Sequence, residues 1–440
     1  MKFSIETFGC RMNICDSEII VTILRDAGHD YVQESSIADV VILNSCSVRE
    51  DGHNAIRKRL ASLSKDAKRR KILVLAGCYA SLLDDSAFSL FPTVDIIVNS
   101  NNYKALPSLL NRISAGERHI ADFSRNNEEV YDDCFPTRVI EDQTTAAVTV
   151  MKGCGQYCSY CIEPYTRGKE KCRSAKSIIN ESMDAAKNGF REITLVGHII
   201  DKYYWREPDS GRNVNFAELL AMVAEHCPKQ RIKFLSSHPG TFSEEILECM
   251  SSYPNIMKVV HLPVQSGSDG ILHKMNRGYS AAEFVTLVER VRERIPEISI
   301  ITDVMVGFCS ETDIDFSKTV NLIKDVNPFD INIYRFSMRQ GTSACRNYFD
   351  DVPESVKKDR YEIMKSLKND IRNSYFEKLI GTNVNLITEG IYMGYDGYYY
   401  GRDNCHRMVT FEGNESVKIN DDVMVRIEGY DAHGLIGKIL

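Results

Sequence analysis

Short apolar runs alternate with amphipathic segments over about the first 110 residues. Four of these runs are rich in β-branched and aromatic residues, and we expect them to be strands: Lys2–Phe8, Asp39–Asn44, Lys71–Ala76 and Asp95–Asn99. Apolar residues at helical spacing around 16–28 and 50–65 predict helices between them. Strands that alternate with helices form a mainly parallel sheet, so the pattern predicts an open α/β domain over residues 1–113.

A second alternating pattern follows a polar, weakly periodic stretch, residues 114–143, which we interpret as a linker. Six strand candidates lie within residues 144–375: Ala147–Met151, Glu192–Val196, Lys233–Ser236, Lys258–Leu262, Ser299–Val306 and Asn332–Phe336. Helical stretches separate most of them, and six such units predict a partial (β/α)6 barrel. The active site of such a barrel lies at the carboxyl ends of its strands.

The last part of the chain, residues 376–440, changes character after a charged helical segment at 353–375. Its short strand-like runs are Val384–Leu386, Tyr398–Tyr400, Met408–Phe411 and Asp422–Ile427. Gly, Asn and Asp interrupt them, which is typical of a small OB-like β-barrel of about five strands. Small barrels of this kind often bind RNA. The whole chain is therefore expected to be an α/β protein with three domains.

Composition narrows the class of protein. The chain has 440 residues, 43% hydrophobic and 26% charged, which suits two or three globular domains. The sequence shows no run of about 18 apolar residues and no apolar leader, so we expect a cytoplasmic protein with no membrane partner. Fourteen cysteines in a reducing compartment favour metal ligation or catalysis over disulfides. With a net charge of −7, nucleic-acid binding would depend on a local basic patch.

The most specific feature is Cys154, Cys158 and Cys161, a C-x3-C-x2-C triplet directly after the first strand of the predicted barrel. Thiolates select iron-sulfur clusters, zinc or copper(I). Three protein ligands leave one corner of a cubane cluster open for a reactant, whereas structural zinc takes four. The alternative is a zinc knuckle completed by Cys172, and the position of the loop favours the cluster.

Three further cysteines, Cys10, Cys46 and Cys78, each follow a predicted strand of the first domain. The carboxyl ends of parallel strands line one crevice of an open sheet, so we expect these thiols to converge as a second three-cysteine site. The alternative is that all three are small buried core residues.

The triplet, with Tyr160 before its last cysteine, resembles the motif of the radical S-adenosylmethionine (SAM) superfamily. Three N-terminal motifs are similar to those of methylthiotransferases: Thr7-Phe-Gly-Cys10-Arg-Met-Asn13, Asn44-Ser-Cys46-Ser-Val-Arg49-Glu50 and Gly77-Cys78. Four later motifs are most similar to the MiaB-type tRNA enzymes: Pro164-Tyr-Thr-Arg167-Gly168, Ser237-His238-Pro239, His261-Leu-Pro-Val-Gln265 and the TRAM-like tail from Gly401-Arg402 to Phe411. The resemblance spans essentially the full chain.

The resemblance implies conversion of N6-isopentenyladenosine, next to the tRNA anticodon, to its 2-methylthio derivative. It assigns a [4Fe-4S] cluster to Cys154, Cys158 and Cys161, where SAM binds and is cleaved to a 5'-deoxyadenosyl radical. It assigns a second, auxiliary [4Fe-4S] cluster to Cys10, Cys46 and Cys78, through which sulfur is delivered, while another SAM supplies the methyl group. The implied partners are the anticodon stem-loop of tRNA and an electron donor such as flavodoxin or ferredoxin.

The resemblance also assigns contacts to cofactor and substrate. The SAM contacts carried over are Tyr160, Gly197, His198, Ser237, Gln265, Asp303 and Gly307. The substrate contacts are Arg167, Arg173, Arg402 and Arg407. The guanidinium of Arg167 or Arg173 has a fork geometry that fits a phosphate or carboxylate. His198 departs from the usual family pattern, and a structural, hydrogen-bonded histidine is its second interpretation.

Two other functions stay open. Residues 376–440 contain ten acidic and six basic residues, which suits a basic protein substrate and keeps open a methylthiotransferase that modifies an aspartate of a ribosomal protein. The tyrosines at 398–400 would favour an RNA substrate over a protein substrate if they stack on unpaired bases. The other interpretation of these tyrosines is packing in the core of the barrel. The basic run Lys68–Lys71 is either a solvated face or a tRNA-backbone patch. A noncatalytic RNA-binding protein with a structural metal is the hypothesis from another class.

Overall fold

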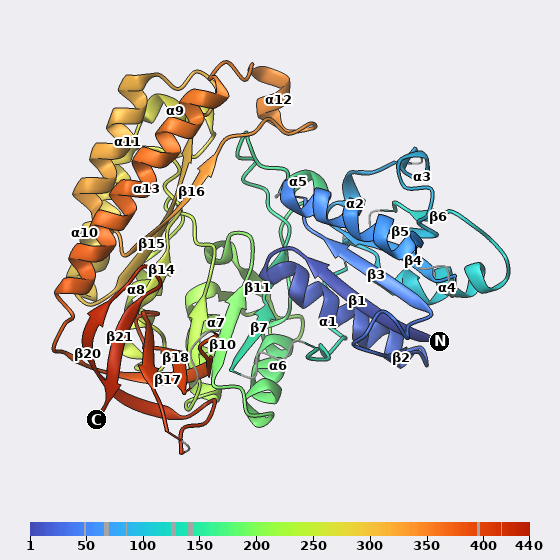
Figure 1. Ribbon diagram of the computed structural model, residues 1–440, viewed down its shortest axis with the longest axis horizontal. Coiled ribbons are helices and arrows are strands. Elements are labelled where there is room, and N and C mark those ends of the chain that lie inside the picture. The colour runs from blue at the N-terminus through green and yellow to red at the C-terminus, as the bar shows by residue number, and fades with distance from the viewer. Residues whose placement is uncertain are drawn as a thin grey trace.

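The chain folds into three successive sheet systems: a parallel sheet, a six-stranded open barrel and a small closed barrel. In Figure 1 the blue N-terminal sheet and the red small barrel lie on either side of the green strands. The computed structural model describes residues 1–47, 50–65, 70–84, 86–124, 129–139, 144–393, 397–414 and 416–440. Among these residues, every helix is too short or too polar to cross a lipid bilayer.

The N-terminal sheet is all-parallel, with the strand order β2-β1-β3-β4-β5-β6. Its strands are β1 Lys2–Phe8, β2 Asp30–Tyr31, β3 Val40–Ser45, β4 Ile72–Gly77, β5 Ile96–Asn99 and β6 Ile120–Asp122. Its helices are α1 Arg11–Asp26, α2 Glu50–Lys65, α3 Ala87–Leu90 and α4 Leu106–Ser114, with 3-10 turns at Ala80–Leu82 and Tyr103–Ala105. The four predicted strands are β1, β3, β4 and β5. The edge strand β6 extends the sheet into the stretch that we interpreted as a linker.

Helices cover both faces of this sheet, which explains why β3 is apolar throughout. Val40 and Ile42 pack toward α1 and α4, whereas Val41 and Leu43 pack toward α2 and α3. The alternation follows the two-residue period of a strand. The core on each face fixes the strand ends, and therefore fixes the three loops that carry Cys10, Cys46 and Cys78.

The six strands of the open barrel form two parallel groups, β13-β10-β7 and β14-β15-β16. Their bounds are β7 Thr145–Thr149, β10 Glu192–Val196, β13 Arg231–Phe234, β14 Val259–His261, β15 Ser299–Val306 and β16 Asp330–Arg335. A single bridge between Ile232 and Ile256 joins the groups, and one core cluster continues through both. This arrangement confirms the predicted partial (β/α)6 barrel.

Helices and two short ribbons complete the barrel. The long helices are α6 Ala175–Lys187, α7 Phe216–His226, α8 Glu244–Ser252, α10 Ala281–Arg294, α11 Asp313–Val326 and α13 Glu354–Glu377. The shorter elements are α5 Glu163–Thr166, α9 Asp269–Lys274, α12 Ser343–Asn347, the 3-10 turn Ile200–Lys202, the ribbon of β8 Met151–Lys152 with β9 Lys171–Cys172, and the ribbon of β11 Tyr204–Arg206 with β12 Asn213–Asn215. Helix α10 begins at a capping box, in which Ser280 Oγ accepts from Glu283 N and the Glu283 carboxylate accepts from Ser280 N.

The small barrel closes in the order β17-β18-β19-β21-β20, as the sequence led us to expect. Its strands are β17 Asn383–Ile391, β18 Tyr398–Arg402, β19 Met408–Glu412, β20 Asp422–Tyr430 and β21 Leu435–Ile439. Helix α13 leads into it, and Phe376 near the end of that helix lies in the small-barrel core. At its other end, Arg360 pairs with Glu311 at 2.8 Å, and Lys357 packs against Gly307. Helix α13 therefore contacts both the small barrel and the loop after β15.

Arg138 holds the first sheet against the barrel. Its guanidinium lies 2.6 Å from the Glu18 carboxylate on α1 and 2.8 Å from the Glu181 carboxylate on α6. Burial raises the pKa of Glu18 to about 7, although Arg138 works to lower it. The folded state therefore binds a proton at Glu18 more readily than the unfolded chain does, and the contribution of Glu18 to folding stability rises as the pH falls from about 7 toward about 4.5.

Replacing Arg138 by Met leaves the buried carboxylate of Glu18 without its counter-charge, whereas Glu181 keeps Arg173 at 2.5 Å. We expect the free energy of unfolding to drop by about 3–5 kcal/mol near pH 8. The loss should shrink near pH 5.5, because Glu18, whose pKa burial raises to about 7, then takes up a proton. Urea midpoints at the two pH values measure this. The control is Arg112→Met, which breaks an exposed ion pair with Glu117 and should leave the urea midpoint almost unchanged. Equal losses in both variants would contradict the prediction.

Candidate functional site

The structure brings the thiols of Cys10, Cys46 and Cys78 together at the carboxyl ends of β1, β3 and β4. Asn13 joins them: its Oδ1 accepts from Cys10 Sγ at 3.4 Å, and its Nδ2 lies 4.0 Å from Cys78 Sγ. A hydrogen bond with the Cys46 side chain is the main reason that the pKa of Cys10 falls to about 6; burial opposes it and the positive charge of Arg167 adds to it. Burial raises the pKa of Cys78 to about 12. We call these three residues the N-terminal cysteine set.

Close packing explains the glycine before Cys78. Gly77 has a φ of +95°, and a Cβ there would lie 2.3 Å from Asn44 Oδ1 and 2.7 Å from the Ser45 carbonyl. Both contacts belong to the loop that carries Cys46, so a side chain at this position would push the two cysteine loops apart.

Cys154, Cys158 and Cys161 lie in the loop between β8 and α5, and we call them the barrel cysteine set. The loop is held by hydrogen bonds from Cys154 N to the Gly168 carbonyl and from Cys161 N to the Cys158 carbonyl, each 2.9 Å long. Burial raises the pKa of Cys154 to about 11, and it raises the pKa of Cys161 further, with help from the negative charges of Glu163 and Cys158. Thiols with raised pKa values are protonated near neutral pH, so they release protons when a cationic metal group binds to them.

Among the described residues, no three His, Cys, Asp or Glu side chains are grouped so as to hold a single metal ion. Cys172, the fourth ligand of the zinc alternative, lies opposite Met151 in the β8–β9 ribbon, and its sulfur accepts a hydrogen bond from Tyr204 N at 3.5 Å.

Each cysteine set has a buried arginine on one of its sulfurs. Arg167 Nε lies 3.1 Å from Cys78 Sγ, and Arg277 Nη1 lies 3.3 Å from Cys158 Sγ. Arg167 Nη1 is also buried and has no hydrogen-bond partner among the described residues. An unpaired guanidinium N–H is costly inside a protein, and an anionic sulfide beside the N-terminal cysteine set would satisfy it. The donor set therefore fits an iron-sulfur cluster at this place.

One carboxylate, that of Glu163 on α5, lies between the two cysteine sets. Its negative charge partly opposes the lowering of the Cys10 pKa by the Cys46 hydrogen bond, and it adds to the rise that burial causes in the pKa of Cys161, so it acts on both sets. Its Oε2 lies 3.1 Å from His198 Nε2 and 3.7 Å from Arg167 Nε. The two cysteine sets are therefore neighbours, although the sequence separates them by more than 70 residues.

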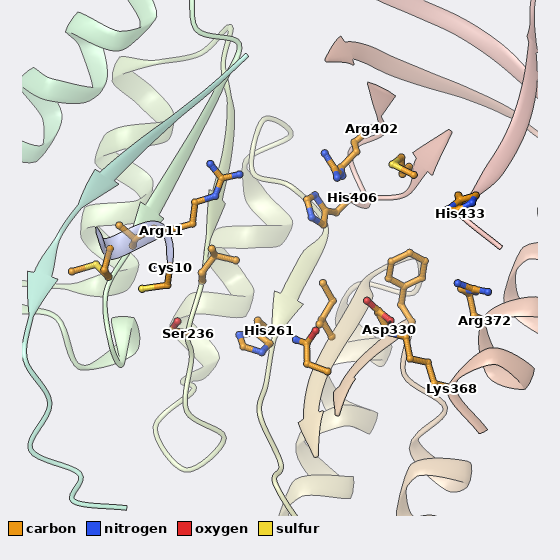
Figure 2. Close-up of a pocket in the computed structure, with 18 of the residues that line it drawn as sticks. Cys10, Arg11, Ser236, His261, Asp330, Lys368, Arg372, Arg402, His406 and His433 are labelled. Atoms are coloured by element: carbon orange, nitrogen blue, oxygen red, sulfur yellow. Dashed lines mark ion pairs between the residues drawn. The ribbon is translucent and has the colours of Figure 1, made fainter. Parts of the chain in front are cut away.

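A cavity of about 660 Å³ opens beside the N-terminal cysteine set. In Figure 2, Cys10 and Arg11 lie on one side, Arg402, His406 and His433 of the small barrel lie on the other, and His261 lies between them. Lys368 and Arg372 of α13 also line it. All three sheet systems therefore contribute to one cavity, and most of the charged side chains on its wall are basic.

The residues assigned to SAM lie at or near the carboxyl ends of barrel strands. Gly197 lines the cavity, and a Cβ there would lie 2.7 Å from Met151 Cγ. Asp303 Oδ1 lies 2.8 Å from His261 Nε2 and accepts from Asn332 Nδ2 at 2.9 Å.

The other assigned residues have these positions. Tyr160 OH is 3.4 Å from Arg277 Nη1, and Ser237 is buried after β13. Gln265 forms a β-bridge with Val304 and has a φ of +74°. Gly307 N donates to the Glu311 carboxylate at 2.6 Å, and His198 pairs with Glu163. The contact of His198 matches its structural interpretation.

The arginines assigned to substrate do not share one environment. Arg167 is 1% exposed and pairs with Asp16 at 2.6 Å, and Arg173 is 4% exposed and pairs with Glu181 at 2.5 Å. Neither guanidinium is open to a phosphate, which corrects our expectation for these two residues. Arg402 lines the cavity and pairs with Glu389, whereas Arg407 is held by Asp403 at 2.5 Å.

Several cavity residues were not found by sequence reasoning: Arg11, Lys368, Arg372, His406 and His433. Arg11 could have been found from the sequence, since it directly follows Cys10. Lys368 and Arg372 are four residues apart on a helix and so share a face.

Tyr399 stacks on Phe411 with ring centroids 6.2 Å apart, which agrees with the packing interpretation of that tyrosine. Arg49, Lys68 and Arg69 lie outside the described residues.

A six-stranded open barrel with a three-cysteine loop after its first strand defines a radical SAM protein. Family comparison agrees: the Radical SAM superfamily matches residues 148–323, and the family described as "Uncharacterized protein family UPF0004" matches residues 2–99. A protein of this superfamily uses a [4Fe-4S] cluster and SAM.

Curated relatives identify the family. The tRNA-2-methylthio-N(6)-dimethylallyladenosine synthase of Bacteroides thetaiotaomicron is 35% identical over 97% of this chain and 93% of its own length. The enzyme of the same name from Christiangramia forsetii is 36% identical over 99% of this chain and 93% of its own length. The chain belongs to the family of the tRNA-2-methylthio-N(6)-dimethylallyladenosine synthases.

Solved structures agree on the fold alone. The radical SAM methyltransferase TsrM from Kitasatospora setae, with cobalamin and a [4Fe-4S] cluster bound, aligns with a TM-score of 0.59 and 14% identity, over 91% of this chain and 80% of that one. The cobalamin-dependent radical SAM enzyme OxsB aligns with a TM-score of 0.54 and 12% identity, over 84% of this chain and 56% of that one.

Proposed function

We propose that this chain is a transferase that converts N6-isopentenyladenosine, also called N6-dimethylallyladenosine, in tRNA to its 2-methylthio derivative. The observation that carries the proposal is the pair of three-cysteine sets on either side of Glu163, next to a cavity that all three sheet systems line. The names of the relatives support tRNA as the substrate, and they favour it over a ribosomal protein or a noncatalytic role.

Two cluster sites give the two cysteine sets different tasks. When bound, the cluster on the barrel cysteine set supplies the electron that cleaves SAM, and an auxiliary [4Fe-4S] cluster on the N-terminal cysteine set supplies the sulfur. The protein's part is to hold both sets at one cavity and to exclude water from them. Cys46, Cys78, Cys154 and Cys158 are all buried, which meets that need.

The strand ends of the barrel provide the groups that orient SAM in this proposal. Asp303 is fixed by His261 and Asn332, so its second carboxylate oxygen is free of these two bonds and can accept from a ribose hydroxyl. Gly197 lets the cavity wall pack closely against Met151, because a Cβ at this position would lie 2.7 Å from Met151 Cγ. Tyr160, Ser237, Gln265 and Gly307 complete the proposed SAM site.

The basic wall of the cavity supports an RNA substrate. Arg11 forms no ion pair among the residues that the structure describes, and it points into the cavity from α1 (Figure 2). Arg372 adds positive charge, whereas Lys368 is paired with Asp330 at 2.8 Å and Arg402 with Glu389. Basic side chains bind phosphates irrespective of sequence and so position the nucleic acid. Since tRNA is the substrate, we place the enzyme in the cytoplasm, with a flavodoxin or ferredoxin as electron donor.

Substitutions in the two cysteine sets should separate their tasks. The chain is purified anaerobically, reconstituted with iron and sulfide, and given reductant, SAM and hypomodified tRNA, with products followed by mass spectrometry. We expect about eight irons per chain and methylthio transfer to adenosine. Cys154→Ala should abolish SAM cleavage, whereas Cys46→Ala should keep cleavage and stop sulfur insertion. Transfer to a ribosomal protein alone, or zinc in place of iron, would refute the proposal.

Arg11→Ala should weaken tRNA binding by removing one phosphate contact. The slope of log K against log salt concentration is negative, and its magnitude should fall by about 0.7–0.9, the contribution of one neutralised phosphate. Binding titrations at several salt concentrations measure the slope. Arg112→Ala is the matched control, because Arg112 is an exposed arginine on α4 that already pairs with Glu117. An unchanged slope for Arg11→Ala would show that Arg11 does not meet the RNA backbone.

A further inference from the structure

We propose that Arg167 and Arg277 are positioning residues that each set the reduction potential of the iron-sulfur cluster on the cysteine set they touch, and that Asp16 opposes the effect of Arg167. The inference rests on the proposed function, because it requires a cluster on each cysteine set. It concerns side chains outside the cysteine motifs, and it assigns each of them to one cluster only.

Arg167 reaches the N-terminal cysteine set from the barrel. Its Nε lies 3.1 Å from Cys78 Sγ, and its side chain is 1% exposed. Its Nη2 donates to Asp16 Oδ2 at 2.6 Å, while its Nη1 has no partner among the described residues. The guanidinium thus offers one N–H to a cysteine sulfur and a second that is available to a sulfide of the same cluster.

Arg277 has the corresponding place at the barrel cysteine set. Its Nη1 lies 3.3 Å from Cys158 Sγ and 3.4 Å from Tyr160 OH. Its Nε donates to Tyr279 OH at 3.0 Å and its Nη2 to the Pro263 carbonyl at 2.8 Å. These oxygen partners are neutral, and in the described part of the chain Arg277 forms no ion pair with a carboxylate.

One-electron reduction makes a cluster more negative by one charge. The electron comes from a low-potential donor and converts [4Fe-4S]²⁺ to [4Fe-4S]⁺, with no bond made or broken in the protein. N–H···S hydrogen bonds and a nearby positive charge stabilise the reduced form more than the oxidised form, and so raise the potential. Both guanidinium groups are buried, where solvent and salt screen such effects little.

Asp16 distinguishes the two arginines. It is fully buried, and although burial works to raise its pKa, Arg167 and Lys152 hold that pKa at about 2, so the carboxylate stays ionised near neutral pH. Its negative charge, 2.6 Å from Arg167, offsets part of the positive charge at Cys78. Removing Asp16 should therefore act on the auxiliary cluster in the opposite direction from removing Arg167.

The test is a potentiometric titration followed by low-temperature EPR. The full-length chain with Cys154, Cys158 and Cys161 replaced by Ala reports the auxiliary cluster alone, and the chain with Cys10, Cys46 and Cys78 replaced by Ala reports the SAM cluster alone. The chain with both cysteine sets intact is titrated in parallel. Arg167→Met should lower the auxiliary potential and Asp16→Asn should raise it. Arg277→Met should lower the SAM-cluster potential and leave the auxiliary potential unchanged.

We expect each shift to change the ratio of reduced to oxidised cluster at a fixed potential by tenfold, which is about 59 mV for a one-electron couple. Arg167→Lys, which keeps the charge, should recover part of the shift. A merely structural role would move the potential in the same direction for Arg167→Met and Asp16→Asn, since both break the same ion pair. That outcome, or no shift in any variant, would overturn the inference. About four irons per chain, or no transfer to tRNA, would instead refute the proposed function.

Discussion

The arrangement of the site depends on a buried ion-pair network at the contact between the first sheet and the barrel. Asp16 on α1 pairs with Lys152 at 2.9 Å and with Arg167 at 2.6 Å, and all three side chains are almost completely buried. Ions removed from water are stable only when paired with good geometry, so the pairs restrict α1 to one position on the barrel. Because Cys10 directly precedes α1 and Arg167 contacts Cys78, the same pairs fix how the two cysteine sets face each other.

The sequence was most informative where a rule of chain geometry applies. Cys10, Cys46 and Cys78 were expected to converge because periodicity located the strands and parallel strands end at one edge. Strands β2 and β6 have only two and three residues and lie at the sheet edges, so no pattern was long enough to predict them. Charge was a poorer guide: the sequence shows that Arg167 and Arg173 are basic but not that the fold buries both of them. Arg277 carried no signal, since its place beside Cys158 arises only in the folded chain.

The cavity reconciles a net charge of −7 with an RNA substrate. Its basic residues come from α1, near the start of the chain, and from α13 and the small barrel, near its end, so no basic run marks the site. Many other charges of the molecule are neutralised locally, as in the pairs of Arg138 with Glu18 and Glu181. What a polyanion meets at the cavity is thus set by the local arrangement of charges, which the total charge does not describe.

Helix α13 has one further consequence. Its 24 residues span roughly 36 Å. At one end, Phe376 is part of the small-barrel core. At the other end, Arg360 forms an ion pair with Glu311, whose carboxylate accepts a hydrogen bond from Gly307 N at 2.6 Å. The helix is thus fixed at both ends by contacts with other parts of the chain. The small barrel and the loop after β15 are therefore joined by one helix, so the position of the small barrel and the backbone at the strand end where SAM is proposed to lie are set by the same element.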